Sequence, residues 1–188
     1  MNYTKAGIII FSLAVILAPW YTTADYDPVS NVISLLGAQN TSFNFVMISA
    51  FICLGSGIIL DGIFNISKQV IPFICFGLFI ALAGMFPHKP LSPDVNYSLI
   101  IHQTHGILAT LSGISISLGL IYRAILGKSI VFKIITFTIS ALCLILPISM
   151  LLFVDFQGLI QRFMYLIIFI WLWQCFPFTS NDSQVSAP

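Results

Sequence analysis

The chain has 188 residues, of which 59% are hydrophobic and only 7% are charged, whereas roughly 25% of the residues in an ordinary soluble domain are charged. Together with a mean hydropathy of +1.04, this composition predicts an integral membrane protein and excludes a soluble globular domain. The formal net charge of only +1 argues against a nucleic-acid partner, because domains that bind nucleic acid are strongly basic.

Six segments are apolar enough to form spanning helices, each of which needs about 20 predominantly apolar residues. They cover residues 6–21, 44–66, 70–86, 99–122, 130–154 and 159–178. The predicted fold class is therefore an all-α integral membrane protein, a six-helix transmembrane bundle that forms one domain over residues 1–178. The polar residues 179–188 predict a disordered tail.

The basic residues near the span ends predict the orientation of this bundle. Five of the seven Lys and Arg residues lie on the side of the N-terminus, namely Lys5, Lys68, Arg123, Lys128 and Lys133. The other two, Lys89 and Arg162, lie on the opposite side. Because Lys and Arg are enriched in cytoplasmic loops, both termini are predicted in the cytoplasm. The first, third and fifth loops then face outward.

The stretch DPVSNVISLLG, residues 27–37, lies between the first two predicted spans and carries the signals of a short helix. Asp27 is a favourable N-cap, Pro28 suits the first helical position, and Gly37 can end the helix. Apolar residues follow one helical face, whereas Ser30, Asn31 and Ser34 take the other; the apolar set is Val29, Val32, Ile33 and Leu36. We predict a short amphipathic helix on the outer face, which either floats among headgroups or covers a polar pocket as a lid.

The fourth span begins LIIHQTHG, so His102 and His105 share one helical face. The same face continues with small residues, Gly106, Ala109, Ser112, Gly113 and Ser117, which let helices approach closely and therefore predict a face that points into the bundle. His88 precedes this span on the same side. Three histidines can bind zinc; hydrogen bonds to loop serines and aspartates, or a proton-sensitive site, are the alternatives.

Polar residues also occur elsewhere in the spans. In the last span Gln157 and Gln161 form one stripe, beside which Arg162 either reaches the headgroups or turns inward to bind an anion. Asp61 is expected to pair with a Lys or Arg at the inner interface, or to serve a proton relay. The four cysteines all fall within spans and are expected to be free thiols.

Three stretches together carry a family resemblance: DPVSNVISLLGA, the junction GMFPHKP to IIHQTHG, and GLIQRFMYLIIFIWL. They resemble the domain-of-unknown-function 998 family of small multi-pass prokaryotic membrane proteins. The resemblance implies a prokaryotic plasma-membrane location and marks as family positions Ser34, Leu36, Gly37, Pro87, His102 or His105, and Arg162. A more distant resemblance is to membrane hydrolases such as alkaline ceramidases, although their second histidine pair in the last span has no counterpart here.

These observations predict a non-enzymatic protein whose outward-facing pocket of His, Arg and Asp residues binds a lipid headgroup or a small amphiphile, for transport, sensing or assembly. The expected ligand-binding residues are Ser30, Asn31, Ser34, His102, His105, Gln161, Arg162 and Asp155. No cofactor is required by this hypothesis, and membrane lipids are the expected partners. The alternative is an intramembrane zinc-dependent hydrolase or transferase with His88, His102 and His105 as ligands and Asp27 or Asp155 as base. A structural subunit that docks a protein partner is a third hypothesis, and the sequence leaves open whether the chain is an enzyme and whether it forms oligomers.

Overall fold

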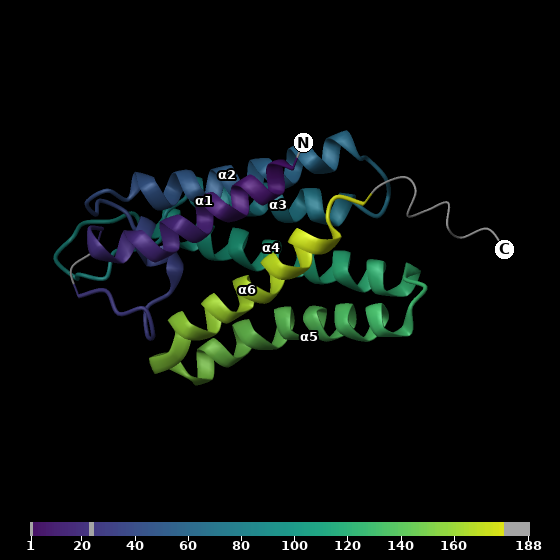
Figure 1. Ribbon diagram of the computed structural model, residues 1–188. Coiled ribbons are helices and arrows are strands. Elements are labelled where there is room, and N and C mark those ends of the chain that lie inside the picture. The colour runs from purple at the N-terminus through teal and green to yellow at the C-terminus, as the bar shows by residue number, and fades with distance from the viewer. Residues whose placement is uncertain (1, 23–24, 179–188) are drawn as a thin grey trace.

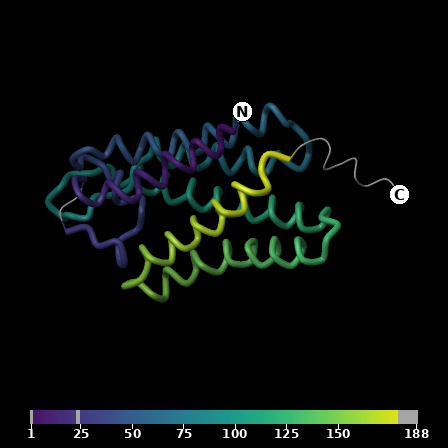
Figure 2. The backbone as a smooth tube through the Cα atoms, in the orientation of Figure 1, coloured from purple at the N-terminus to yellow at the C-terminus, as the bar shows by residue number. Residues whose placement is uncertain are grey.

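Six antiparallel α-helices make up most of the protein in a computed structural model, which describes residues 2–22 and 25–178. They are α1 (Tyr3–Leu17), α2 (Phe45–Phe64), α3 (Ile71–Met85), α4 (Leu99–Leu126), α5 (Ile130–Leu152) and α6 (Gln157–Cys175). Three short 3-10 helices are η1 (Ala18–Trp20), η2 (Ile33–Gly37) and η3 (Val154–Phe156). Figures 1 and 2 show the helices side by side along one direction. The predicted all-α bundle is confirmed, and the predicted tail at residues 179–188 lies outside the described residues.

Five of the six predicted spans are long and apolar enough to cross a membrane, but α3 is shorter. Its 15 residues extend about 22 Å, less than the roughly 30 Å hydrocarbon core of a bilayer. Prolines set both ends of this helix: Pro72 lies in the first turn, and Pro87 disfavours helical geometry at Phe86, which has φ −111° and ψ 82°.

The two ends of the bundle carry different connections. We call one the histidine end, formed by residues 18–22, 25–44, 86–98 and 153–156, and the other the terminal end, formed by residues 65–70, 127–129 and 176–178. Each helix runs from one end to the other, so the chain starts and finishes its six helices at the terminal end (Figure 1). The cytoplasmic placement of that end stays a prediction.

Helices α1, α2 and α3 form a closely packed half, in which glycines bring backbones into contact. A Cβ on Gly55 of α2 would meet the carbonyl oxygen of Gly77 of α3, and a Cβ on Gly77 would meet that of Gly55. A Cβ on Gly57 would likewise meet the Tyr3 carbonyl of α1. Such small-residue contacts are the usual basis of helix association in membranes, and we call this part the glycine-packed half.

Asp61, on α2 in the glycine-packed half, stabilises the start of α1. Its side chain accepts hydrogen bonds from the backbone N–H groups of Tyr3, at 3.2 Å, and Thr4, at 2.7 Å, and the residue is 2% exposed. A helix leaves its first N–H groups without partners inside the helix and favours a carboxylate there. The expected ion pair with a Lys or Arg is therefore wrong: the partner is a helix N-terminus.

Helices α4, α5 and α6 form the other half, which is more open at the histidine end. α6 crosses the bundle obliquely, from α5 at the histidine end toward α3 at the terminal end (Figure 1). At the terminal end Trp171 stacks on Phe73 of α3 with ring centroids 5.5 Å apart and donates to Thr136 of α5. We call α4, α5 and α6 the open half, because α6 makes no such contact with α3 near its beginning.

The segment between α1 and α2 is a short helix, as predicted, but not the α-helix of nearly three turns over residues 27–37. The Asp27 carboxylate accepts from the N–H groups of Val29 and Ser30, so a tight turn begins at this residue. Val32 is then extended, at φ −64° and ψ 150°, and only Ile33–Gly37 is helical, as the 3-10 helix η2. Gly37 does not adopt a left-handed conformation; Met47 of α2 lies where its side chain would be.

Candidate functional site

A cavity of about 410 Å³ lies within the membrane-spanning part of the protein, between α3, α4, α5 and α6. Its walls come from Phe76 and Ile80 of α3 and from residues 109–116, 143–151 and 157–168 of the other three helices. No charged residue lines it. Its volume falls within the roughly 300–1,000 Å³ of small-molecule sites, and such walls suit a hydrocarbon chain.

The cavity exists because small residues of α4 have no partner helix. Gly113, which lines it, has no atom within 4 Å of the position a Cβ would occupy, and the same is true of Gly106 about two turns earlier. Ser112 and Ser117 are buried, but Gly106 and Ala109 are exposed. The prediction that the whole small-residue face points into the bundle is therefore wrong for its Gly106 side.

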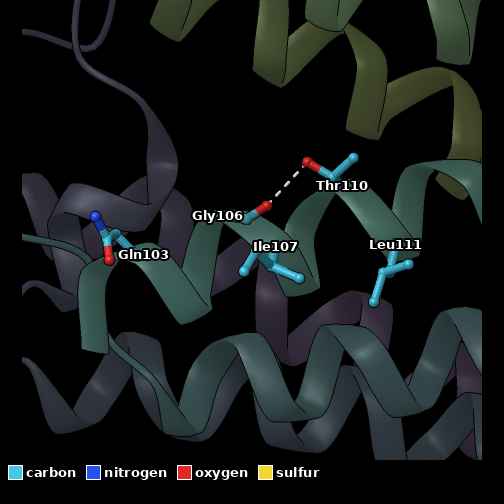
Figure 3. A pocket seen from close by; sticks show the side chains of 5 residues that line it. All are labelled: Gln103, Gly106, Ile107, Thr110 and Leu111. Carbon is cyan, nitrogen blue, oxygen red and sulfur yellow. Dashed lines mark hydrogen bonds between the residues drawn. The ribbon is translucent and has the colours of Figure 1, made fainter. Parts of the chain in front are cut away.

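The hydroxyl groups of this α4 surface are satisfied within the helix. Thr110 donates to the Gly106 carbonyl at 2.9 Å, and Ser112 donates to the Ala109 carbonyl at 2.7 Å. Figure 3 shows the Thr110 and Leu111 side chains pointing to opposite sides of α4, along a shallow depression that Gln103, Gly106 and Ile107 also line. These residues therefore present methyl and methylene groups to the cavity.

Two glutamines of α6 give the cavity a polar rim at the histidine end. Gln157 donates through Nε2 to the Met150 carbonyl of α5 at 3.0 Å. Gln161 accepts through Oε1 from the N–H of Ile33 at 2.5 Å. Within the described residues, the Oε1 of Gln157 and the Nε2 of Gln161 make no hydrogen bond. One uncharged acceptor and one uncharged donor therefore remain for a ligand.

Residues 26–33 pack onto the first turns of α6, and we call them the strap. Gly158 is buried because the carbonyl oxygens of Pro28 and Asn31 lie where a side chain would project. The N–H of Leu159, which has no acceptor inside α6, donates to the Val29 carbonyl at 2.9 Å. The strap thus lies beside the rim of the cavity and docks through its backbone, and its role as a lid stays a prediction.

Arg162 holds the strap to α6. Its Nη1 donates to the carbonyl oxygens of Pro28, at 2.7 Å, and Asn31, at 3.2 Å. Its Nη2 donates to the hydroxyl of Tyr26 at 2.8 Å, and burial raises the pKa of that tyrosine. Arginine has five N–H donors in a fixed fork, so one side chain ties three strap residues together.

The polar side chains of the strap are used locally. The Ser30 hydroxyl donates to the Asp27 carboxylate at 2.7 Å, and the Asn31 side chain accepts from the Asp27 N–H at 2.9 Å. The hydrogen bonds from Ser30 and Val29 lower the pKa of Asp27 below its usual value. Ser34 follows in η2 and is buried. None of these side chains lines the 410 Å³ cavity.

The three histidines form a separate cluster where α3 passes into α4. The ring of His88 lies 4.4 Å from that of His102 and 5.6 Å from that of His105, measured between centroids. His105 is 7% exposed, and its Nδ1–H donates to the carbonyl oxygens of Ala83, at 2.8 Å, and Phe86, at 2.9 Å. These carbonyls lie at the C-terminal end of α3, where no helical donor remains, so His105 caps that helix.

The other two histidines bond to the same loop. His88 donates through Nδ1 to the Lys89 carbonyl, and the Lys89 N–H donates to Nδ1 of His102 at 3.4 Å. Burial lowers the pKa of His88 to about 4, and the charges of its histidine and lysine neighbours act in the same direction. Within residues 2–22 and 25–178, no group of three His, Cys, Asp or Glu residues is arranged to hold a metal ion. The zinc site stays a prediction.

The predicted site residues therefore divide into two places. Gln161 and Arg162 lie at the rim of the cavity and under the strap, whereas His88, His102 and His105 lie at the α3–α4 connection and do not line the cavity. Asp155 is exposed in η3. Gln39, which follows η2, bonds through its side chain to Pro87 and Ser98 next to the histidines. Sequence reasoning gave no role to Gln39, Tyr26 or Gly158, whose partners are distant in the chain.

Comparison with known proteins gives a family. Residues 6–174 match the model of a family described as Protein of unknown function (DUF998), the family that the sequence motifs resemble. No curated protein and no solved structure matches the chain.

Proposed function

We propose that this chain, which belongs to the DUF998 family, is a multi-pass membrane protein that binds the hydrocarbon chain of an uncharged amphiphile without transforming it. The chain of the ligand fills the cavity between α3, α4, α5 and α6. Its polar group, a hydroxyl or an amide, lies at the histidine end against Gln157 and Gln161.

The observation that carries this proposal is the cavity itself, with apolar walls and an amide rim. A charged group in such walls would pay the full cost of leaving water, so a neutral polar group is favoured. The free acceptor of Gln157 and the free donor of Gln161 select a group that both donates and accepts. Burying the ligand chain contributes roughly 0.8 kcal/mol for each CH₂ removed from water, although a lipid leaving the bilayer gains less.

The walls of the cavity also allow the ligand to enter directly from the lipid bilayer. Several cavity residues are also exposed on the outside of the bundle, among them Leu144, Ile148 and Leu151 of α5. The cavity therefore reaches the surface that faces lipid, and a ligand chain can enter sideways. The strap lies at the histidine end of the same cavity, where it can limit the movement of the polar group.

The test fills the cavity without disturbing the packing. Gly113→Leu adds a side chain where no atom lies within 4 Å, inside the cavity. Gly106→Leu is the matched control, because it makes the same change on the same helix, also into open space, but outside the cavity. Both proteins are purified in a mild detergent, and bound lipids are identified by native and extract mass spectrometry.

We expect one bound amphiphile per chain in the wild type and in Gly106→Leu, and loss of it in Gly113→Leu with the melting temperature preserved. Equal retention of the same amphiphile by both variants would contradict the proposal, as would purified wild-type protein that binds no amphiphile from added membrane lipids.

A further inference from the structure

A second concave surface lies between α1 and α6, on the other side of Tyr165 from the cavity. It has a volume of about 240 Å³ and apolar walls that include Phe11 of α1 and Leu166 and Phe169 of α6, with Ile33 of η2 at its histidine end. Tyr165 lines both spaces, and its ring packs against Phe11 at 5.1 Å between centroids. The two spaces are therefore separated by one aromatic side chain.

This groove differs from the cavity in its polar groups. Arg162 and Ser12 line it, so it carries a positive charge, whereas no charged residue lines the cavity. Within the described residues, no carboxylate lies within ion-pair distance of Arg162. In the same part of the chain, neither the Nε–H of Arg162 nor the hydroxyl of Ser12 makes a hydrogen bond.

Asp27 is the carboxylate whose charge acts on Arg162, but its hydrogen bonds are made to other residues. It accepts from the hydroxyl and N–H of Ser30 and from the N–H of Val29. Lys89, the other basic residue at the histidine end, lies beside His88 and His102 rather than in this groove. The positive charge at the head of this apolar groove thus forms no ion pair within the described residues, and the charge of Asp27 acts on it only from beyond ion-pair distance.

We infer that the groove between α1 and α6 binds an anionic phospholipid of the leaflet at the histidine end. The phosphodiester lies on the free edge of the Arg162 guanidinium, where a charge-assisted hydrogen bond is stronger than a neutral one. The Ser12 hydroxyl donates to an ester carbonyl, and one acyl chain follows Phe11, Leu166 and Phe169. This site is separate from the cavity proposed above, and its ligand is anionic, whereas the cavity takes an uncharged amphiphile.

The experiment compares two phospholipids with the same acyl chains, one with an anionic head group and one whose head group has no net charge. Purified protein in detergent is titrated with dioleoyl phosphatidylglycerol or dioleoyl phosphatidylcholine, and bound lipid is counted by native mass spectrometry. Ser12→Phe fills the groove while leaving Arg162 and its hydrogen bonds to the strap unchanged in sequence, and Leu13→Phe, on a side chain that is 52% exposed, is its matched control on α1. Arg162→Gln removes the positive charge, whereas Arg162→Lys keeps the charge but lacks the planar set of guanidinium N–H donors.

We expect the wild type and Leu13→Phe to bind the glycerol lipid about tenfold more tightly than the choline lipid. Both lipids offer a phosphodiester to Arg162, but the quaternary ammonium of choline offsets its charge and is repelled by the guanidinium. Ser12→Phe and Arg162→Gln lose this preference, Arg162→Lys retains part of it, and inorganic phosphate at equal concentration does not compete. Equal binding of the two lipids by the wild type, or a preference that survives both Ser12→Phe and Arg162→Gln, would overturn the inference. Retention of the cavity amphiphile by Ser12→Phe separates this outcome from failure of the proposed function.

Discussion

The two halves of the bundle use the same residue type in opposite ways. In the glycine-packed half, Gly55 and Gly77 let α2 and α3 touch through their backbones, whereas in the open half Gly106 and Gly113 of α4 face no atom within 4 Å. The first arrangement removes space and the second creates it. Because protein interiors are normally close-packed, the unfilled space next to Gly113 is the feature of this fold that calls for a ligand.

The largest difference between the halves should appear when the same large residue is placed in each. Gly55→Leu forces a side chain against the Gly77 backbone, and such overpacking costs about 3 kcal/mol or more, so we expect little folded protein. Gly113→Leu should melt within a few degrees of the wild type. Thermal melts of both variants in one detergent, followed by gel filtration, make the comparison. Similar losses in both would show that the halves do not differ in packing.

The stability of the connection between α3 and α4, where the two halves meet, should depend on pH through His88. Because its pKa is about 4 in the folded protein and roughly 6.5 when unfolded, the unfolded state binds more protons between these values. Stability should therefore rise as pH increases from 4 to 6.5, by at most about 3 kcal/mol, and stay level above that. Melting temperatures from pH 4.5 to 7.5 test this, and His88→Gln should flatten the curve. An unchanged slope in that variant would assign the effect to other groups.

A smaller loss is expected when the helix cap in the glycine-packed half is removed. Asp61→Ala leaves the buried N–H groups of Tyr3 and Thr4 without their acceptor, at a cost of about 2 kcal/mol. Asp61→Asn keeps one oxygen acceptor and should lose less. Chemical denaturation in detergent ranks the two variants. If both lost the same amount, the charge of Asp61 rather than its acceptor geometry would be the source of stability.

A substitution under the strap should have the smallest effect on the stability of the whole protein. It should nevertheless greatly increase the hydrogen exchange of the strap itself. Gly158→Ala places a methyl group against the Pro28 and Asn31 carbonyls, while alanine favours helix α6 by up to about 1 kcal/mol over glycine. The melting temperature should hardly change. Backbone amides of residues 29–33 should exchange with deuterium about tenfold faster, as about 1.4 kcal/mol of lost docking would give. Gly106→Ala is the control, and unchanged exchange in Gly158→Ala would show that the strap does not dock on Gly158.

The sequence predicted the features that depend on single helices. Apolar runs set the spans to within a few residues, and the helical spacing of His102 and His105 placed His105 correctly in the interior. For Arg162 the sequence left two alternatives, a side chain that reaches the headgroups or one that turns inward to bind an anion. The structure shows that it donates to backbone carbonyls of the strap, and such backbone acceptors leave no trace in the side-chain pattern.

The features that depend on pairs of helices could not be predicted. Gly55 and Gly113 both occur in apolar helices with small neighbours, and periodicity shows which residues share a face but not what faces them. The cavity follows from the oblique path of α6, which stacks on α3 at the terminal end. The strap was predicted as an α-helix because its apolar spacing is helical, yet its backbone instead supplies carbonyls to α6.

The most direct test of the cavity uses a lipid that carries a photoactivatable diazirine halfway along its acyl chain. The lipid is added to membranes that contain the protein, activated by light, and the labelled peptides are mapped by mass spectrometry. The cavity proposal predicts labels within residues 109–116 and 143–151, reduced in Gly113→Leu and unchanged in Gly106→Leu. Labels confined to the exposed surface of α5 around Ile134 and Ile135, equal in both variants, would show that the lipid only surrounds the protein.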